Sequence, residues 1–354
     1  MKKPSKREWN LSNNNRMKYS RLISAVLAAV LVSGRAAAGP FDFVKNLDFK
    51  SFFQDINPNL NPDLNLSVET GSTGLGFGVE SRLNHQFRVR TGFDWIPRFR
   101  KTLHFEIQVG EDGDPGYDSE GRSHFDRMAD YLYEMTGFGI DQNVDMFAEP
   151  RFHNFRMLVD VFPFRDDRWY FTAGFYTGPS TVGIAYNKTE EMTTLISVSM
   201  YNNIYEKVYD IEYNDESELD GVFMGLELPP FVNEKILEAG RMGMHIGDFK
   251  DGTPYIMEPD ADNMVKARMK VNAFRPYIGA GYEGLLDPRN DRLHFNAYCG
   301  MMFWGGTPRV YTHDGTEIVR GLDNVMGQVG HYVDLVKPLK VYPVINISIS
   351  YRLF

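Results

Sequence analysis

The strongest constraint on this chain is an alternation of apolar and polar residues that recurs in segments of about ten residues. The chain closes on one such segment, VYPVINISISYRLF, in which Ile345, Ile347 and Ile349 alternate with asparagine and serine. The segment FRVRTGFDW (87–95) repeats the pattern with arginine and aspartate on its polar face. A period of two is typical of β-strands, and ten residues suffice for a tilted strand to cross a bilayer. We therefore expect a chain built mainly from two-faced strands.

Eight segments fit this pattern and predict eight strands: 64–71, 74–82, 86–97, 153–162, 168–178, 273–285, 292–304 and 342–354. Short connections alternate with long ones, as in a transmembrane barrel with an even number of antiparallel strands. An extra pair at 221–228 and 241–249 would raise the count to ten, and KTLHFEIQVG (101–110) leaves twelve open. The expected fold is all-β, an antiparallel transmembrane β-barrel of eight to ten strands, with the strand 342–354 closing against 64–71.

Alternation alone does not tell which face is inside, because a soluble sandwich buries its apolar face and a membrane barrel turns that face to lipid. Aromatic residues near the strand ends favour the membrane barrel, whose two interfaces carry aromatic girdles. The residues expected in these girdles are Trp95, Trp169, Tyr176, Tyr277, Trp304, Tyr342 and Tyr351.

The N-terminal region has the layout of a secretory signal. After Met17 come Lys18 and Arg21, an apolar run over 22–32, and small residues at 36–38. The run is too short to span a bilayer, and the small residues suit cleavage. We predict a signal peptide over 1–38, with Met17 as the true start, a periplasmic segment over 39–63, and an outer-membrane barrel over 64–354. Past the signal no apolar run of eighteen residues follows, so no transmembrane helix is expected.

The net charge of the chain limits the classes of molecule it can bind, and its cysteine content limits the disulfide bonds it can form. The whole chain carries −9, and removal of residues 1–38 takes away eight Lys and Arg and one Glu, which leaves 30 basic against 46 acidic residues, or −16. Such a balance argues against nucleic acid as a partner. The single cysteine, Cys299, excludes an internal disulfide framework.

Three stretches of the long connections read as helices: 123–135, 189–208 and 323–337. In the second, Thr189 stands at an N-cap position, followed by Glu190 and Glu191 in the first turn. We expect short helices that cap one mouth of the barrel.

With these features the chain resembles the outer-membrane β-barrel proteins of Gram-negative bacteria, and its style is similar to that of barrel proteins of the Bacteroidota. The resemblance rests on the signal, on TGLGFGVESRLNHQFRVRTGFDWIP, on FRPYIGAGYE and on the closing ISISYRLF. It implies outer-membrane lipid and the barrel-assembly machinery as partners, with Tyr351, Leu353 and Phe354 as the assembly signal. Phe354 departs from the class pattern, because it falls in the polar phase with Arg352.

The polar faces of the predicted strands carry charges that would have to pair inside a narrow barrel, since an unpaired charge out of water is costly. The expected lumen network comprises Glu80, Arg88, Arg90, Asp94, Arg156, Asp160, Glu283 and Arg352. Eight strands are just filled by such side chains, whereas ten or twelve would leave a narrow pore.

The sequence gives weaker support to two further functions, calcium binding and hydrolysis. Asp112, Asp114, Asp118 and Glu120 are oxygen ligands at a spacing that suits Ca²⁺, but the full calcium-loop pattern is missing, so a solvated acidic loop without a cofactor is favoured. Hydrolysis would draw on His313 with Asp314, or on His124 with Ser123 and Asp126, yet no nucleophile motif accompanies them. We therefore do not expect an enzyme.

The function predicted from sequence is a monomeric outer-membrane barrel with a sealed, charged lumen. Its expected role is structural or surface ligand-binding, through a ligand outside the cell that the sequence does not name. The alternative is a narrow transport channel for small solutes, and an outer-membrane hydrolase ranks third.

Overall fold

The computed structural model describes residues 63–109, 117, 119–137, 139–213, 230–325 and 327–353. The predicted signal peptide, most of the segment 39–63, the strand predicted at 221–228 and Phe354 lie outside these residues. No described helix is long and apolar enough to cross a membrane.

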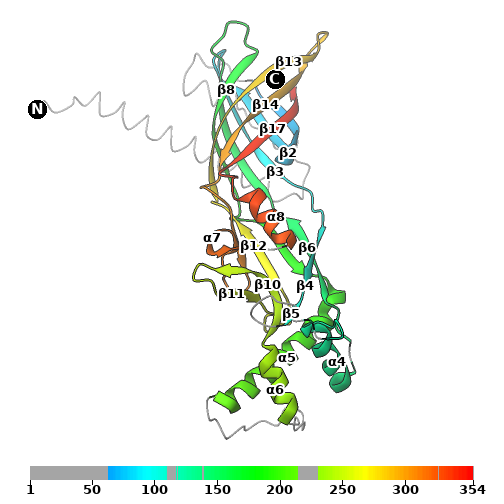
Figure 1. Ribbon diagram of the computed structural model, residues 1–354. Coiled ribbons are helices and arrows are strands. Elements are labelled where there is room, and N and C mark those ends of the chain that lie inside the picture. The colour runs from blue at the N-terminus through cyan, green and yellow to red at the C-terminus, as the bar shows by residue number, and fades with distance from the viewer. Residues whose placement is uncertain are drawn as a thin grey trace, which may run out of the picture.

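Eight antiparallel strands close into a barrel at one end of the elongated molecule (Figure 1). They are β1 (Asn65–Gly71), β2 (Gly74–Arg82), β3 (Phe87–Trp95), β7 (His153–Val161), β8 (Trp169–Thr177), β13 (Phe274–Asp287), β14 (Asn290–Phe303) and β17 (Val341–Arg352). Their order around the wall is β1-β17-β14-β13-β8-β7-β3-β2. All eight strands correspond to the eight predicted from the alternation, and the closing pair of the first and last strands is confirmed.

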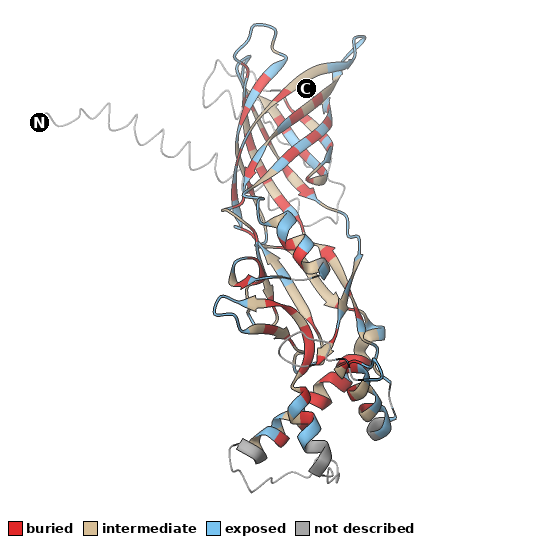
Figure 2. Ribbon diagram, in the orientation of Figure 1, coloured by how far each residue is buried: buried red, intermediate tan, exposed pale blue. Residues whose placement is uncertain are grey.

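The register of the closing pair explains why the last strand alternates. Val68 on β1 lies opposite Ile349 on β17, and Glu69 lies opposite Ser348. Val68 and Ile349 are exposed on the outer wall, whereas Glu69 and Ser348 are buried in the lumen. Apolar residues therefore pair on the outside and polar residues on the inside, which decides the question that alternation left open. Figure 2 shows this alternation of buried and exposed residues along the barrel strands.

Most connections at the two ends of the barrel differ in length; the two-residue turn from β1 to β2 lies at the same end as the long ones. Short turns join β2 to β3, β7 to β8 and β13 to β14, and we call this the short-turn end. In the first of them, the Asn84 side chain accepts hydrogen bonds from the backbone N–H groups of Gln86 and Phe87, at 2.8 and 2.9 Å. The three long connections all leave from the opposite end, which we call the extension end.

The three long connections fold together into a second β-rich body, the extension (Figure 1). Its five-stranded sheet has the order β15-β12-β9-β6-β4. These strands are β4 (Lys101–Glu106), β6 (Asn143–Pro150), β9 (Thr181–Asn187), β12 (Lys266–Lys270) and β15 (Arg309–Thr312). A second sheet is built around β10 (Met242–Phe249), with β5 (Gln108–Val109), β11 (Pro254–Met257) and β16 (Leu322–Asp323).

The extension corrects two sequence-based expectations. The segments 241–249 and 101–110 do form strands, but they belong to the extension and add nothing to the barrel. The long connections are also not simple helical caps, because short strands continue the barrel wall beyond its rim. The strands of the five-stranded sheet have only four to eight residues, too few for their alternation to stand out in the sequence.

Helices pack around the extension, chiefly at its far tip (Figure 1). They are α4 (His124–Thr136), η1 (Thr189–Glu191), α5 (Met192–Tyr213), α6 (Pro230–Ala239), α7 (Ile318–Gly321) and α8 (Gly327–Val336). The three predicted helical stretches are largely confirmed, but Thr189 is not the N-cap, since Lys188 takes that position before η1. Their apolar sides close a core around Leu132, Val144, Leu195 and Met242, and this core makes the extension a folded unit.

Candidate functional site

The barrel lumen is the most highly organised polar site among the described residues. Asp160 on β7 lies directly opposite Arg88 on β3, because the register of this pair places them side by side. Asp160 Oδ2 lies 2.7 Å from Arg88 Nε and 2.8 Å from Arg90 Nε. Its other oxygen accepts a hydrogen bond from Thr172 on β8 at 2.7 Å. One buried carboxylate therefore joins three strands and is shared by two guanidinium groups.

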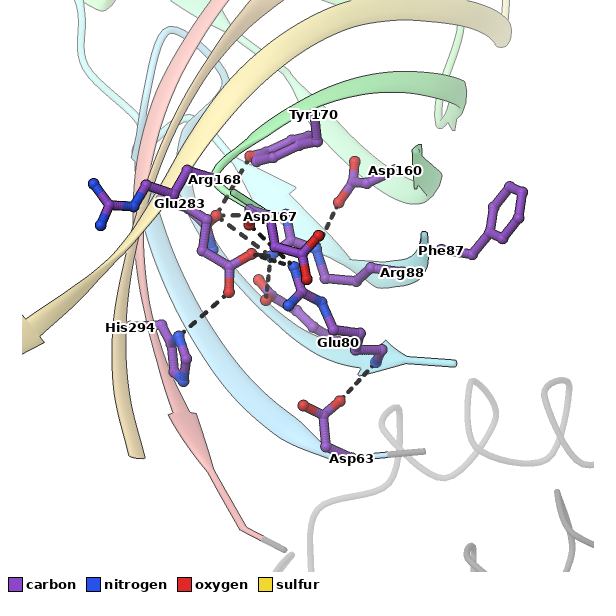
Figure 3. A network of polar contacts seen from close by, with 12 residues as sticks. Asp63, Glu80, Phe87, Arg88, Asp160, Asp167, Arg168, Tyr170, Glu283 and His294 are labelled. Carbon is purple, nitrogen blue, oxygen red and sulfur yellow. Dashed lines mark hydrogen bonds and ion pairs between the residues drawn. The ribbon is translucent and has the colours of Figure 1, made fainter. Parts of the chain in front are cut away.

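Arg88 extends this first layer across the lumen (Figure 3). Its Nη1 donates to Glu283 Oε2 on β13 at 2.7 Å and lies 3.7 Å from Glu80 Oε2 on β2. His294 on β14 lies 3.3 Å from the other oxygen of Glu283. Buried ion pairs are stable only when their geometry is good and their remaining polar atoms are bonded. This layer meets the first condition by linking charges on opposite walls, but Glu80 Oε2 and Arg90 Nη1 are buried without a hydrogen-bond partner among the described residues.

A second layer lies closer to the extension end and is centred on Arg156 of β7. The Arg156 guanidinium donates to Glu69 on β1 and to Asp94 on β3. The Tyr298 hydroxyl donates to Glu69 at 2.9 Å and accepts a hydrogen bond from Asn346 at 3.0 Å. Strands β1, β3, β7, β14 and β17 are thus linked through the pair Arg156 and Glu69.

Glycines make room for the Arg156 side chain. A Cβ atom on Gly78 would lie 2.9 Å from Arg156 Nη2, and one on Gly92 would lie 3.0 Å from it. Such distances are shorter than carbon and nitrogen atoms tolerate without a shift. The space beside the glycines on the polar faces of β2 and β3 is therefore filled by the Arg156 side chain and is not open lumen.

Tyrosine rings fill the space between the charged groups. Arg88 Cζ lies 4.6 Å from the ring centroid of Tyr170, and Arg90 Cζ lies 4.4 Å from that of Tyr298. These are cation–π distances, which add to the stabilisation of desolvated guanidinium groups. Arginine and tyrosine side chains therefore occupy the lumen between the two charge layers.

At the extension end the lumen is closed by an apolar cluster beside Arg275. Arg275 is fully buried, and its guanidinium donates to the backbone carbonyls of Asn272 and Pro179 at 2.7 and 2.6 Å and to the side chain of Asn154. The surrounding cluster comprises Phe152, Val182, Val271, Tyr277, Met302, Trp304 and Val344. Arg275 thus ties the segment that leaves β8 and the segment that enters β13 to the barrel mouth.

This cluster corrects part of the predicted aromatic girdle. Tyr176, Tyr277 and Trp304 point inward and are buried, and Tyr342 is half-buried between Phe152 and Trp304. Trp95, Trp169 and Tyr351 are exposed on the outer wall. Nearness to a strand end was a poor criterion, because the phase of the alternation decides which way a side chain points.

The structure brings seven of the eight predicted lumen charges together: Glu80, Arg88, Arg90, Asp94, Arg156, Asp160 and Glu283. Arg352 lies at the short-turn rim instead, half-buried, with Nη2 3.1 Å from His294 Nε2. The predicted network did not include Glu69, Tyr298 and Asn296, although the alternation places all three on polar strand faces, and it missed Arg275. All four occupy the inward phase of their strands, and that phase was the signal available for finding them.

The other predicted sites are placed differently. Asp112, Asp114 and Asp118 lie outside the described residues, and Glu120 lies 3.9 Å from Arg122. Within the part of the chain that the structure describes, His, Cys, Asp and Glu do not gather in threes as metal ligands would. At the C-terminus, Tyr351 faces outward and the Leu353 N–H donates to Leu64 at 2.8 Å.

The acidic partners of the two histidine pairs serve local structure, whereas His313 Nδ1 is buried without a hydrogen-bond partner in the part of the chain that the structure describes. Ser123 and Asp126 form the capping box that starts α4, where the Ser123 hydroxyl oxygen accepts from the Asp126 N–H at 3.1 Å. His124 contacts Arg127 at 2.8 Å. Asp314 accepts hydrogen bonds from the hydroxyls of Tyr255 and Thr312, at 2.7 and 2.5 Å, within a turn after β15. These contacts tie the acidic partners to caps and turns.

Comparison with known proteins gives fold neighbours at low similarity. No protein-family model matches the chain, and no curated protein matches it. Among solved structures, CarO2 of Acinetobacter baumannii is 12% identical with a TM-score of 0.34, over 83% of this chain and 99% of that one. CarO of the same organism is 11% identical with a TM-score of 0.33, over 82% and 98%. A major outer membrane protein from Thermus thermophilus is 10% identical with a TM-score of 0.28, over 83% and 100%.

Proposed function

We propose that this protein is an outer-membrane β-barrel whose sealed lumen serves as an anchor for the extension on the cell surface. The observation that carries the proposal is the distribution of side chains in the barrel, which is the opposite of that in a soluble protein. Apolar side chains lie on the outer wall and charged side chains lie inside. Val68, Phe171 and Ile345 are 62%, 57% and 64% exposed, whereas Asp160 is 0% exposed. An apolar outer wall of this extent would be unstable in water and suits lipid.

The dimensions of the wall support this placement. Strands β2, β3, β7 and β8 each have nine residues. At a tilt of roughly 40° such strands span about 23 Å, close to the apolar band of about 25 Å in outer-membrane barrels. The wall is therefore long enough to cross a bilayer and the extension stands outside it.

Orientation follows from the lengths of the connections. Outer-membrane barrels keep short turns on the periplasmic side and long loops on the outside. The short-turn end then faces the periplasm, and the extension projects from the cell. A role in surface structure or in binding an extracellular ligand follows, because the extension is the part of the molecule that would face the medium.

The lumen favours an anchor over a channel. Both charge layers are tied across the barrel, the glycine-lined space holds Arg156, and the apolar cluster covers the outer mouth. A narrow transport channel for small solutes would need a continuous wet path through these layers. Hydrolysis ranks lower still, since Asp126 and Asp314, the acidic partners of the two histidines, are already bonded in a helix cap and a turn.

Surface labelling tests the proposal. Single cysteines would be placed at Asp262 in the extension and at Arg289 in a short turn, both in a Cys299→Ala background. A membrane-impermeant maleimide should label D262C on intact cells and R289C only after the outer membrane is permeabilised. Labelling of R289C but not D262C on intact cells would reverse the orientation, and labelling of neither before lysis would refute surface display.

A further inference from the structure

The outward face of the five-stranded sheet carries a cluster of basic side chains just beyond the barrel. On β12, Lys266, Arg268 and Lys270 alternate with the inward residues Ala267 and Met269. The register pairs Lys270 with Arg309 on β15 and Arg268 with Tyr311. In an antiparallel pair, residues directly opposite each other point to the same face. Three cations and a tyrosine therefore share one patch, formed by Arg268, Lys270, Arg309 and Tyr311.

The alternation along the chain shows that the patch residues point to the same side as the apolar residues of the outer wall. On β13, Phe274 and Ile278 are 56% and 54% exposed on the outside, whereas Arg275 and Tyr277 point inward. Counting back in steps of two from Phe274 reaches Lys270 and Arg268, and the intervening Val271 is buried. At the usual strand rise and barrel tilt, Lys270 stands about 10 Å beyond Phe274. That is the level of the headgroups next to an apolar band.

The three cations of the patch form no ion pair among the described residues, and the acidic residue Glu317, which forms a β-bridge with Tyr311, acts on Arg309 only at longer range. Lys266 is paired with Asp260 at 2.7 Å, but Arg268, Lys270 and Arg309 have no carboxylate within 4.0 Å among the described residues. Lys270 Nζ lies 5.2 Å from the ring centroid of Tyr311, and Arg309 Nη1 lies 3.5 Å from its hydroxyl. Tyr311 thus holds two cations of like charge close together. In a chain whose net charge is −9, such a cluster indicates an anionic partner.

A groove on the same face adds a second cluster of arginines. It has a volume of about 440 Å³ and is lined by Arg98, Phe99, Arg100, Glu149, Arg151 and Tyr186. Glu149 lies 2.7 Å from Arg100 Nε and 3.6 Å from Arg151 Nη2, and it also accepts a hydrogen bond from Tyr186 at 2.6 Å. The lining therefore holds three guanidinium groups against one carboxylate, and the groove keeps a net positive charge beside the exposed ring of Phe99.

We propose that this basic face binds the phosphate groups of lipid headgroups in the outer leaflet of the membrane. The inference rests on the proposed membrane placement, because that placement puts the patch and the groove at headgroup level. Guanidinium groups bind phosphate through two parallel hydrogen bonds, and a basic residue at an anionic membrane surface contributes to attraction at close range. The exposed Phe99 ring would enter the interface beside the phosphates.

The test uses the full chain in detergent micelles and fluorescent diphosphoryl lipid A as the probe. The variant R268Q/K270Q/R309Q removes the patch charges. Its matched control, R165Q/K250Q/R289Q, removes three exposed charges from turns outside the five-stranded sheet. We expect the patch variant to weaken binding roughly a hundredfold and the control to change it less than about threefold. Equal loss in both variants would show unspecific charge attraction and overturn the proposal.

Further arms separate the sources of phosphate. Monophosphoryl lipid A should bind more weakly than the diphosphoryl form, and phosphatidylcholine should not compete. If inorganic phosphate displaces the probe at the same concentration as unlabelled lipid A, the ligand is free phosphate and the lipid assignment is wrong. Displacement by a lipid-free acidic polysaccharide would assign the face to a soluble polyanion instead. Because binding is measured in micelles, its failure would leave the labelling of D262C and R289C unaffected.

Discussion

Arg88 on β3 donates a hydrogen bond to Glu283 on β13 at 2.7 Å, across the lumen of the barrel. The two strands are not neighbours in the wall, so this contact joins parts of the barrel that backbone pairing does not. Together with the contacts of Arg156, it replaces the apolar core that a soluble protein would have.

Replacement of Arg88 by methionine should destabilise the barrel strongly. The change leaves Glu80 without its ion-pair partner and deprives Asp160 and Glu283 of their shared cation, and loss of one partner from a buried pair costs about 3–5 kcal/mol. Equilibrium unfolding in urea, followed by tryptophan fluorescence in micelles, would measure it. The control R289M removes an exposed arginine from a turn and should change the free energy of unfolding by less than about 0.5 kcal/mol. Equal stability of the two variants would contradict a central role for the network.

Addition of a methyl group at Gly281 should also destabilise the barrel. A Cβ there would clash with the ring and hydroxyl of Tyr170, and the Tyr170 ring is held against Arg88. Overpacking of this kind costs about 1–3 kcal/mol. On the same strand, a Cβ at Gly284 would meet its nearest neighbour, Tyr282, at 3.4 Å, which is ordinary contact. G281A should thus unfold at lower urea concentration than G284A, and the reverse order would show that the lumen has room at Tyr170.

The groove on the extension predicts a pH dependence. Hydrogen bonds from Tyr186 and Arg100 hold the pKa of Glu149 below its ordinary value. A carboxyl with a lowered pKa stabilises the fold above its unfolded-state pKa, and this contribution is lost as the pH falls through the folded-state pKa. Loss of the tyrosine hydroxyl in Y186F should raise the pKa of Glu149. Carboxyl-carbon NMR, with the resonance assigned by its absence in E149Q, would measure both values, and an unchanged pKa in Y186F would refute the stated cause.

The barrel was predictable from sequence because its signal is strong and local. Each of its strands has at least seven residues, and strands such as 87–95 keep strict alternation between Phe87, Val89 and Phe93 and the charged positions. The parity of the connections required an even count and predicted the closing pair, but it left eight, ten and twelve strands open, and the structure shows eight.

The extension and the partners inside the lumen were harder to predict. Strands as short as Arg309–Thr312 carry little periodicity, and Lys266–Lys270 becomes recognisable as a strand only through its neighbours β9 and β15. Within the lumen, the phase showed that Arg156 points inward, but register between distant strands decides that it meets Glu69 rather than Glu80. Such long-range pairing is set by barrel closure and is not contained in any local segment.

Single-channel recording on the purified full chain in planar bilayers tests the sealed lumen most directly. Insertion would first be verified by heat modifiability on gels, since a folded barrel migrates differently before and after boiling. The account predicts a flat baseline under applied voltage, because the two charge layers and the apolar cluster at Trp304 fill the barrel. Reproducible conductance steps of uniform size from the folded protein would contradict it and would establish a channel instead.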